Sequence, residues 1–423
     1  MADADGSIVD VPDVVDNALR HIASKQGFKK PHFHVTSGAQ NRDGYMSTLF
    51  RCVIRDEDSA GPTELKVMVK ISREGMETMM ECLFGIEGLV YETLLPAQKE
   101  LAGLREPLPW PKCYFSDVKG RQPYCLVLED FGPEGFVNAD RSKGLDAAHM
   151  RLALEQLGKF HGASMALVRL RPELFKTIKD QLPVLFRLPE FCNIMKPFIV
   201  PVPSLPGLVE SRYPKGSHVH TVLRKLCDSF KDTFPQLMWP LPPEDGRGCT
   251  FVHGDCMINN MAFKYDKDGA VQACKLYDFQ VGSYMEVAQD FMWLLFCNTE
   301  KEMRDEHWES LLRGYIDVVH DTLRASGCDD PEDIYSLDLL KEQLKRLAVP
   351  ALCIQPLMWS FMTADDDQVD EVRNDMAAPE QSVSVPLRTT PKLIEHYIGL
   401  IENVIDWGWF PTVEDIDRYT AEA

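Results

Sequence analysis

One stretch near the middle of the chain, residues 250–280, constrains the fold more than any other part of the sequence. It reads TFVHGDCMINNMAFKYDKDGAVQACKLYDFQ, with short apolar runs on both sides of the polar turn at 266–269. This pattern predicts a β-hairpin. Such a hairpin brings Asn260 and Asp278 together at its open end, and Asp255 lies in the loop just before it. The sequence therefore predicts that three oxygen-bearing side chains converge.

These residue types suit the transfer of a phosphoryl group. Carboxylate and amide oxygens are the ligands of hard cations such as Mg²⁺, which usually takes only one or two protein ligands in addition to phosphates. The reaction also needs a carboxylate that orients or deprotonates the attacking hydroxyl, a lysine that contacts the nucleotide phosphates and a glutamate that fixes this lysine. Lys70 and Glu87 supply that pair in the N-terminal part of the chain.

The positions of these two charged residues in their predicted elements support the pairing. A predicted strand over 63–71, the second of a hairpin, alternates apolar and polar residues, so Lys70 points away from the core face. A predicted helix over 77–95, which a proline ends, places Glu87 inside its apolar stripe. A carboxylate there is costly unless it has a cationic partner. Each residue therefore supplies the partner that the other needs when buried.

The spacing H-G-D-x-x-x-x-N followed by D-F resembles the motifs of kinase-like small-molecule phosphotransferases, the group that includes aminoglycoside and choline kinases. HGDCMINNMAFKYD with KLYDFQ is more narrowly similar to the ecdysteroid kinase-like family of arthropods. The F-x-x-E-x-x-x-Y-x-x-x-L-P run at 84–96, VLEDF at 127–131, KFHGASM at 159–165 and Asp290 after DFQ carry the same resemblance. These landmarks extend over much of the chain.

The resemblance implies an α+β class and a two-lobed, protein-kinase-like fold. Residues 1–130 would form a small N-terminal lobe with an antiparallel sheet, and residues 131–423 a large, mostly helical C-terminal lobe. ATP and Mg²⁺ would bind between them, and phosphate would pass to a hydroxyl of a small molecule, with an ecdysteroid as the leading candidate. Choline or a xenobiotic alcohol as acceptor, or a catalytically inactive ligand-binding protein, are the alternatives.

The resemblance also implies a role for each matching position. Asp255 would be the catalytic residue, and Asn260 and Asp278 would be the metal ligands. Lys70 and Glu87 would form the pair that grips the nucleotide phosphates. Asn259 stands next to Asn260, so a shift of register would exchange the two, but the spacing from the preceding aspartate favours Asn260.

Further residues are expected to bind the nucleotide or to support the catalytic loop. In the connection between the lobes, the backbone around Leu128, Glu129 and Asp130 would meet the adenine of the cofactor. His253 and Asp290 would brace the catalytic loop as structural support. A general base at His253 is the alternative to this bracing role.

Two features depart from the kinase pattern. The segment SGAQNRDGYMSTLF, before the first strand of the hairpin, contains no G-x-G-x-x-G, so a phosphate-covering loop is expected over 43–47 without assigned contacts. Gln280 replaces the glycine of protein kinases and the acidic residue common in antibiotic kinases, and the ecdysteroid kinase-like family carries Gln at this position. His161 lies on a helical stripe and is expected to be a hydrogen-bonded core residue.

The formal net charge of −20 argues against nucleic acid and anionic membranes as partners. The acidic N-terminal residues 1–16 do not have the pattern of a signal peptide. The apolar run at 291–297 is too short to span a bilayer.

The twelve cysteines include no C-x-x-C pair, which indicates free thiols in a reducing cytoplasm. The sequence leaves the oligomeric state open.

Overall fold

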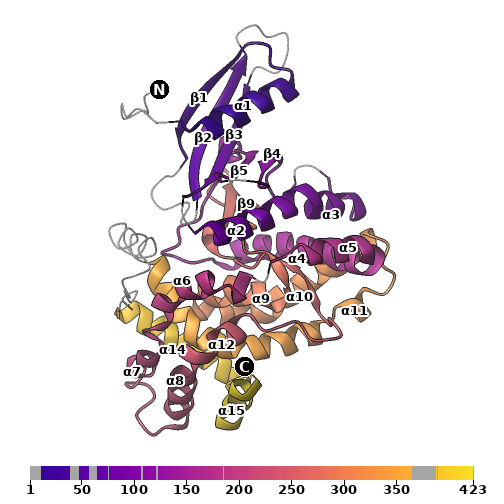
Figure 1. The fold of residues 1–423 in the computed structure, drawn as a ribbon. Coiled ribbons are helices and arrows are strands. Elements are labelled where there is room, and N and C mark those ends of the chain that lie inside the picture. The colour runs from indigo at the N-terminus through magenta and orange to yellow at the C-terminus, as the bar shows by residue number, and fades with distance from the viewer. Residues whose placement is uncertain are drawn as a thin grey trace.

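The N-terminal part of the computed structural model is built on an antiparallel sheet with the strand order β1-β2-β3-β5-β4 (Figure 1). Its strands are β1 (Pro31–Ser37), β2 (Ser47–Asp56), β3 (Glu64–Ser72), β4 (Cys113–Asp117) and β5 (Cys125–Glu129). The structure describes residues 11–38, 47–56, 64–74, 76–105, 108–120, 122–183, 185–363, 387 and 389–422. β2 and β3 form the predicted hairpin.

Helix α1 (Asp13–Gln26) covers one face of this sheet (Figure 1). The side chains of Val67, Val69 and Ile71 on β3 are buried with α1 in a small hydrophobic core of their own. Because side chains alternate along a strand, Lys70 points to the opposite face. The alternation of core-facing and outward-facing side chains predicted for this strand is confirmed.

The segment after β3 forms helix α2 (Glu77–Leu89), a π-helical turn (Val90–Leu94) and helix α3 (Leu95–Leu101). The prediction that a proline ends the helix near residue 95 is wrong. Pro96 lies in the first turn of α3, and the helical chain continues through it directly after the π-helical turn. The apolar side chains of α2 belong to the large core that also contains the C-terminal helices.

Two small antiparallel sheets follow the connection between the lobes. β6 (Phe136–Val137), β8 (Met261–Tyr265) and β9 (Val271–Leu276) form an antiparallel sheet in the order β6-β8-β9. β7 (Cys249–Val252) pairs with β10 (Ser283–Glu286). The predicted hairpin around 266–269 is confirmed as β8 and β9, whereas β10 was not expected from the sequence.

Helices make up most of the remaining chain. They are α4 (Ala147–Leu170), α5 (Pro172–Asp180), α6 (Pro189–Ile199), α7 (Leu205–Leu208), α8 (His218–Met238), α9 (Ala288–Phe291), a π-helical turn (Met292–Phe296), α10 (Lys301–Ala325), α11 (Pro331–Ile334), α12 (Leu337–Met362), α14 (Pro391–Asp406) and α15 (Val413–Glu422). α4 is capped at its N-terminus, because the Asp146 side chain accepts from Ala148 N and His149 N. α4 packs closely on α10, since a Cβ atom at Gly162 would lie 2.9 Å from Thr322.

The small antiparallel sheet and the larger helical part confirm the predicted α+β class and the predicted distribution of sheet and helix along the chain (Figure 1). The expected boundary at residue 130 falls between β5 and β6. All twelve cysteines are free thiols, as the sequence predicted. Within the described part of the chain, no helix has both the length and the apolar character needed to cross a membrane.

Candidate active site

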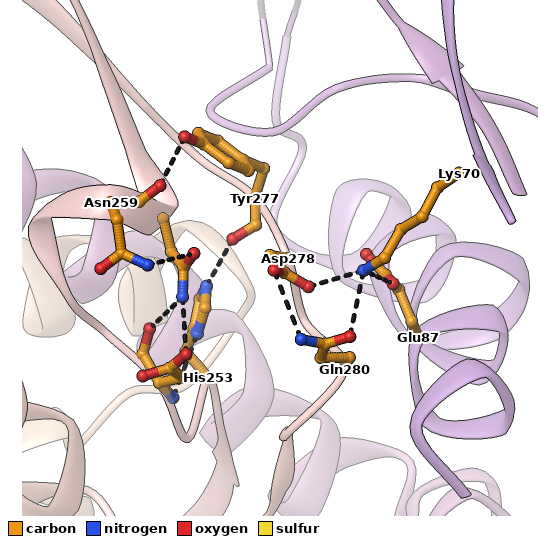
Figure 2. A network of polar contacts seen from close by, with 9 residues as sticks. Lys70, Glu87, His253, Asn259, Tyr277, Asp278 and Gln280 are labelled. Atoms are coloured by element: carbon orange, nitrogen blue, oxygen red, sulfur yellow. Dashed lines mark hydrogen bonds and ion pairs between the residues drawn. The ribbon is translucent and has the colours of Figure 1, made fainter. Parts of the chain in front are cut away.

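Lys70 and Glu87 form a buried ion pair between the sheet and helix α2 (Figure 2). Lys70 Nζ lies 2.6 Å from Glu87 Oε2, and the two residues are 6% and 1% exposed. β3 directs the lysine toward α2, and the apolar stripe of α2 directs the glutamate toward β3. Burial is the main reason why the pKa of Glu87 is raised above its ordinary value, although the ammonium group opposes this shift.

Asp278 lies just beyond the end of β9 and contacts the same lysine. Lys70 Nζ is 2.7 Å from Asp278 Oδ1 and 3.2 Å from Gln280 Oε1. Asp278 has a left-handed backbone, with φ of 68°, a conformation that Asp tolerates better than most residues. Burial acts to lower the pKa of Lys70, but the carboxylates of Asp278 and Glu87 outweigh it and raise this pKa, so the lysine is charged.

The two catalytic-loop residues predicted from the sequence, Asp255 and Asn260, are hydrogen-bonded to each other. Asn260 Nδ2 donates to the backbone oxygen of Asp255 at 2.9 Å and to its Oδ2 at 2.8 Å. Asn259 does not take the place of Asn260, because its side chain donates to Asn260 Oδ1 at 3.2 Å. Burial, with the nearby charge of Asp278, raises the pKa of Asp255 to about 6.

The glycine of the H-G-D motif is required by both its conformation and its surroundings. Gly254 has φ of 84°, and a Cβ atom added there would lie 2.2 Å from the backbone oxygen of Val281. The segment after Asp278 therefore presses directly on the loop that carries Asp255. This contact explains why only glycine fits between the histidine and the aspartate.

Asp290 braces this loop through its backbone. Its Oδ2 accepts from His253 N and its Oδ1 accepts from Gly254 N, each at 2.8 Å. His161 Nε2 lies 3.0 Å from Asp290 Oδ2, and its Nδ1 lies 2.9 Å from the hydroxyl of Tyr315. Burial would raise the pKa of Asp290, but the hydrogen bond and charge of His161 hold it below its ordinary value. The expectation for His161 as a hydrogen-bonded core residue is confirmed.

His253 is also fully engaged in the framework of the site. Its Nε2 lies 3.0 Å from the backbone oxygen of Tyr277, and its Nδ1 accepts from Asp255 N at 3.4 Å. The ring thus ties the loop to the strand that ends at Asp278 (Figure 2). These contacts favour the bracing role over that of a general base.

Asn298 is a support of the loop that sequence reasoning missed. It is fully buried, its Oδ1 accepts from Ile258 N at 3.1 Å, and its Nδ2 donates to the backbone oxygens of Trp293 and Leu294 at 2.6 and 3.1 Å. Its own backbone oxygen accepts from Leu145 N at 2.7 Å. A polar residue directly after the apolar run 291–297 is the one sequence signal that could have indicated it.

The connection between the lobes is held by two ion pairs, one to each lobe. Lys275 Nζ lies 3.2 Å from Glu129 Oε2, and Arg51 Nε lies 2.9 Å from Asp130 Oδ2. The backbone N–H groups of Glu129 and Asp130 donate to the backbone oxygens of Lys112 and Lys66. Neither N–H can therefore meet an adenine ring unless that contact breaks.

Leu128 is buried on β5, next to this connection.

The expected phosphate-covering loop over 43–47 lies outside the described residues, except for Ser47 at the start of β2. The structure thus brings Lys70, Glu87 and Asp278 into direct contact. Asp255 and Asn260 form a second hydrogen-bonded group. The two groups interact electrostatically, because the charge of Asp278 raises the pKa of Asp255.

Comparison with solved structures finds similar chains at low sequence identity. An ethanolamine kinase of Plasmodium vivax, Pv091845, is 12% identical with a TM-score of 0.40, and the match covers 89% of this chain and 91% of that chain. A thermostable mutant of the aminoglycoside phosphotransferase APH(4)-Ia, in ternary complex with ADP and hygromycin B, is 11% identical with a TM-score of 0.29, covering 86% and 97%. Scores this low do not establish a common fold.

A comparison with curated proteins finds no significant match. The sequence profile of the ecdysteroid kinase-like family, in contrast, matches residues 41–328. This range covers more than half of the 423 residues and contains every candidate site residue described above. The chain therefore belongs to the ecdysteroid kinase-like family.

Proposed function

We propose that this protein is an ATP-dependent phosphotransferase that phosphorylates a hydroxyl of a small molecule. The observation that carries the proposal is the 2.7 Å contact between Lys70 Nζ on β3 and Asp278 Oδ1 just after β9. It joins an ammonium suited to nucleotide phosphates with a carboxylate suited to a metal ion. Family membership supports the same class of reaction.

Asp255 is the residue we assign to the acceptor hydroxyl. Its carboxylate would orient the hydroxyl and accept its proton as the oxygen attacks the γ-phosphorus, while the bond from that phosphorus to ADP breaks. Asn260 holds this carboxylate by its amide nitrogen, and Asp290 fixes the backbone that precedes it. The supports therefore keep Asp255 in one orientation during the reaction.

The residues present fit a Mg²⁺ ion. The Asn260 nitrogen is held by Asp255, so its oxygen is the end turned away from that carboxylate, and Asp278 offers a half-buried carboxylate. Among the described residues, no cluster of three or more His, Cys, Asp or Glu side chains could hold a metal alone. Asn260 and Asp278 would hold Mg²⁺ together with phosphate oxygens, and when bound it neutralises phosphate charge.

Lys70 would contact the nucleotide phosphates, with Glu87 holding it in place. The adenine would lie against the connection at Leu128, Glu129 and Asp130. A carbonyl group of this connection, rather than the occupied N–H groups of Glu129 and Asp130, would then meet the base. A cytoplasmic location fits the twelve free thiols.

The leading candidate for the acceptor is an ecdysteroid, an assignment supported by the family match. A panel experiment tests it together with the alternatives. The purified protein is incubated with Mg²⁺ and ATP and with ecdysteroids, choline and xenobiotic alcohols, and the products are weighed by mass spectrometry. We expect one acceptor to gain the mass of a phosphoryl group, and the Asp255→Ala variant to form far less of this product in the same time. A protein that binds an acceptor but neither binds Mg²⁺ with ATP nor modifies the acceptor would instead be an inactive member.

A further inference from the structure

The ammonium group of Lys70 has an acceptor for each of its three protons. Glu87 Oε2 lies at 2.6 Å, Asp278 Oδ1 at 2.7 Å and Gln280 Oε1 at 3.2 Å from Nζ (Figure 2). An ammonium has three N–H donors and accepts nothing. A phosphate oxygen can therefore bind this lysine only when one of the three acceptors leaves.

The orientation of the Gln280 amide follows from its two neighbours. Its Oε1 faces the ammonium of Lys70, and its Nε2 donates to Asp278 Oδ2 at 3.4 Å. The opposite orientation would turn the NH₂ group toward the ammonium and the oxygen toward a carboxylate. The side chain therefore bridges Lys70 and Asp278 in one defined way.

The three acceptors differ in how firmly they hold the lysine. Glu87 and Asp278 are carboxylates at short distance, so each adds the attraction of a full opposite charge to its hydrogen bond with the ammonium. Glu87 is also almost completely buried, at 1% exposed. Gln280 is neutral, half-buried and the most distant of the three. An incoming phosphate oxygen displaces the Gln280 amide most easily.

We propose that Gln280 is a placeholder for a nucleotide phosphate, and thus a positioning residue that sets nucleotide affinity. Its amide oxygen accepts the third N–H of Lys70 until a phosphate oxygen takes its place. This inference rests on the proposed function, since it needs a nucleotide whose phosphates approach Lys70. It further implies that Lys70 is already held in its binding position before a nucleotide binds.

Two substitutions make opposite predictions for nucleotide binding. Gln280→Met keeps the length of the side chain but removes the competing acceptor, so the dissociation constant for ADP should fall by about 2- to 10-fold. Gln280→Glu replaces a neutral competitor with a charged one and repels phosphates, so the constant should rise by about 10-fold or more. Isothermal titration of the full chain with ADP, in EDTA so that no metal contributes, measures both.

Three controls separate the possible outcomes. Circular dichroism spectra show whether each variant is folded, and Gln280→Ala replaces Gln280→Met if the latter does not fold. If the unmodified protein fails to bind ADP or ATP even with Mg²⁺, the proposed function fails. If the unmodified protein binds ADP, but Gln280→Met binds it equally or more weakly, the placeholder role is wrong while the proposed function stands. Lys70→Met should bind ADP far more weakly than any Gln280 variant.

Discussion

Asn298 and Ile258 are 40 positions apart in the chain, and the Asn298 side-chain oxygen accepts from the Ile258 backbone nitrogen at 3.1 Å. This bond joins the end of a π-helical turn to the catalytic loop. Asn298→Ala removes it and also removes the side-chain N–H groups that donate to the carbonyls of Trp293 and Leu294. We expect the free energy of unfolding to fall by about 2 to 4 kcal/mol. Urea denaturation measures it, and the exposed Asn193→Ala should change it by no more than about 0.5 kcal/mol.

Asp255→Ala tests the assignment of the proton acceptor. Without the carboxylate, turnover should fall by about 10²- to 10⁴-fold, because the acceptor hydroxyl is neither oriented nor deprotonated. ATP should still bind, since Lys70 and Glu87 are unchanged. Steady-state kinetics with the acceptor found in the panel and a thermal shift with Mg²⁺ and ATP measure the two effects. Turnover close to that of the unmodified protein would contradict the assignment.

Asp278→Ala tests the metal-binding role. The variant loses a carboxylate that contacts Lys70 and that would hold Mg²⁺. We expect activity to be lost and only partly restored by raising the Mg²⁺ concentration, because one ligand of the ion is missing. Activity measured over a range of Mg²⁺ concentrations tests this. A variant with the same Mg²⁺ dependence as the unmodified protein would exclude Asp278 as a ligand.

Gly254→Ala and Gly269→Ala form a matched pair. Both glycines have nearly the same left-handed backbone, with φ of 84° and 83°, but only Gly254 faces a close neighbour. Alanine at Gly269 should cost about 1 to 2 kcal/mol for the backbone alone. Alanine at Gly254 must also displace the Val281 carbonyl, so it should cost more than about 3 kcal/mol. Equal losses in the free energy of unfolding, measured by chemical denaturation, would show that the Val281 carbonyl moves aside at little energetic cost.

His396 predicts a pH dependence of stability. Burial lowers its pKa in the folded protein, although Glu300 at 2.9 Å opposes this shift; Arg304 and Lys392 add to it. Below the ordinary pKa of about 6.5, the unfolded chain then binds more protons than the folded one. The free energy of unfolding should therefore decrease as the pH falls from about 6.5 to 5, by up to about 1.4 kcal/mol per pH unit from this group.

The variant His396→Phe isolates this contribution. A phenyl ring keeps the stacking on Trp359, whose ring centroid lies 3.7 Å from that of His396, but it carries no proton in this range. Urea denaturation at several pH values should give a shallower slope for the variant than for the unmodified protein. Identical slopes would mean that His396 has the same pKa in both states.

Short-range patterns in the sequence predicted the parts of the site that local structure determines. The alternation along 63–71 placed Lys70 on the face opposite the α1 core, and the apolar stripe of α2 placed Glu87 in a buried position. The hairpin of β8 and β9 was likewise evident from its turn. In each case the information lies within a few residues of the side chain concerned.

Contacts that depend on distant parts of the chain were not predictable in the same way. Asn298 is recognisable only from the carbonyls that the π-helical turn presents to it and from the position of Ile258. Helix α8 was missed because its surroundings are rich in proline and Pro235 lies inside the helix itself. Strand β10 is four residues long and exists through its pairing with β7. Tertiary packing decides all three.

The strand that carries Lys70 and the helix that carries Glu87 are packed into different hydrophobic cores. The sheet shares its core with α1, whereas α2 is embedded with the C-terminal helices. Leu126 and Leu128 of β5 nevertheless belong to the core of α2, so a rocking motion of the sheet would change the ammonium-to-carboxylate distance and shift the packing between β5 and α2. A spectroscopic distance probe placed across this ion pair would report the displacement of β3 relative to α2.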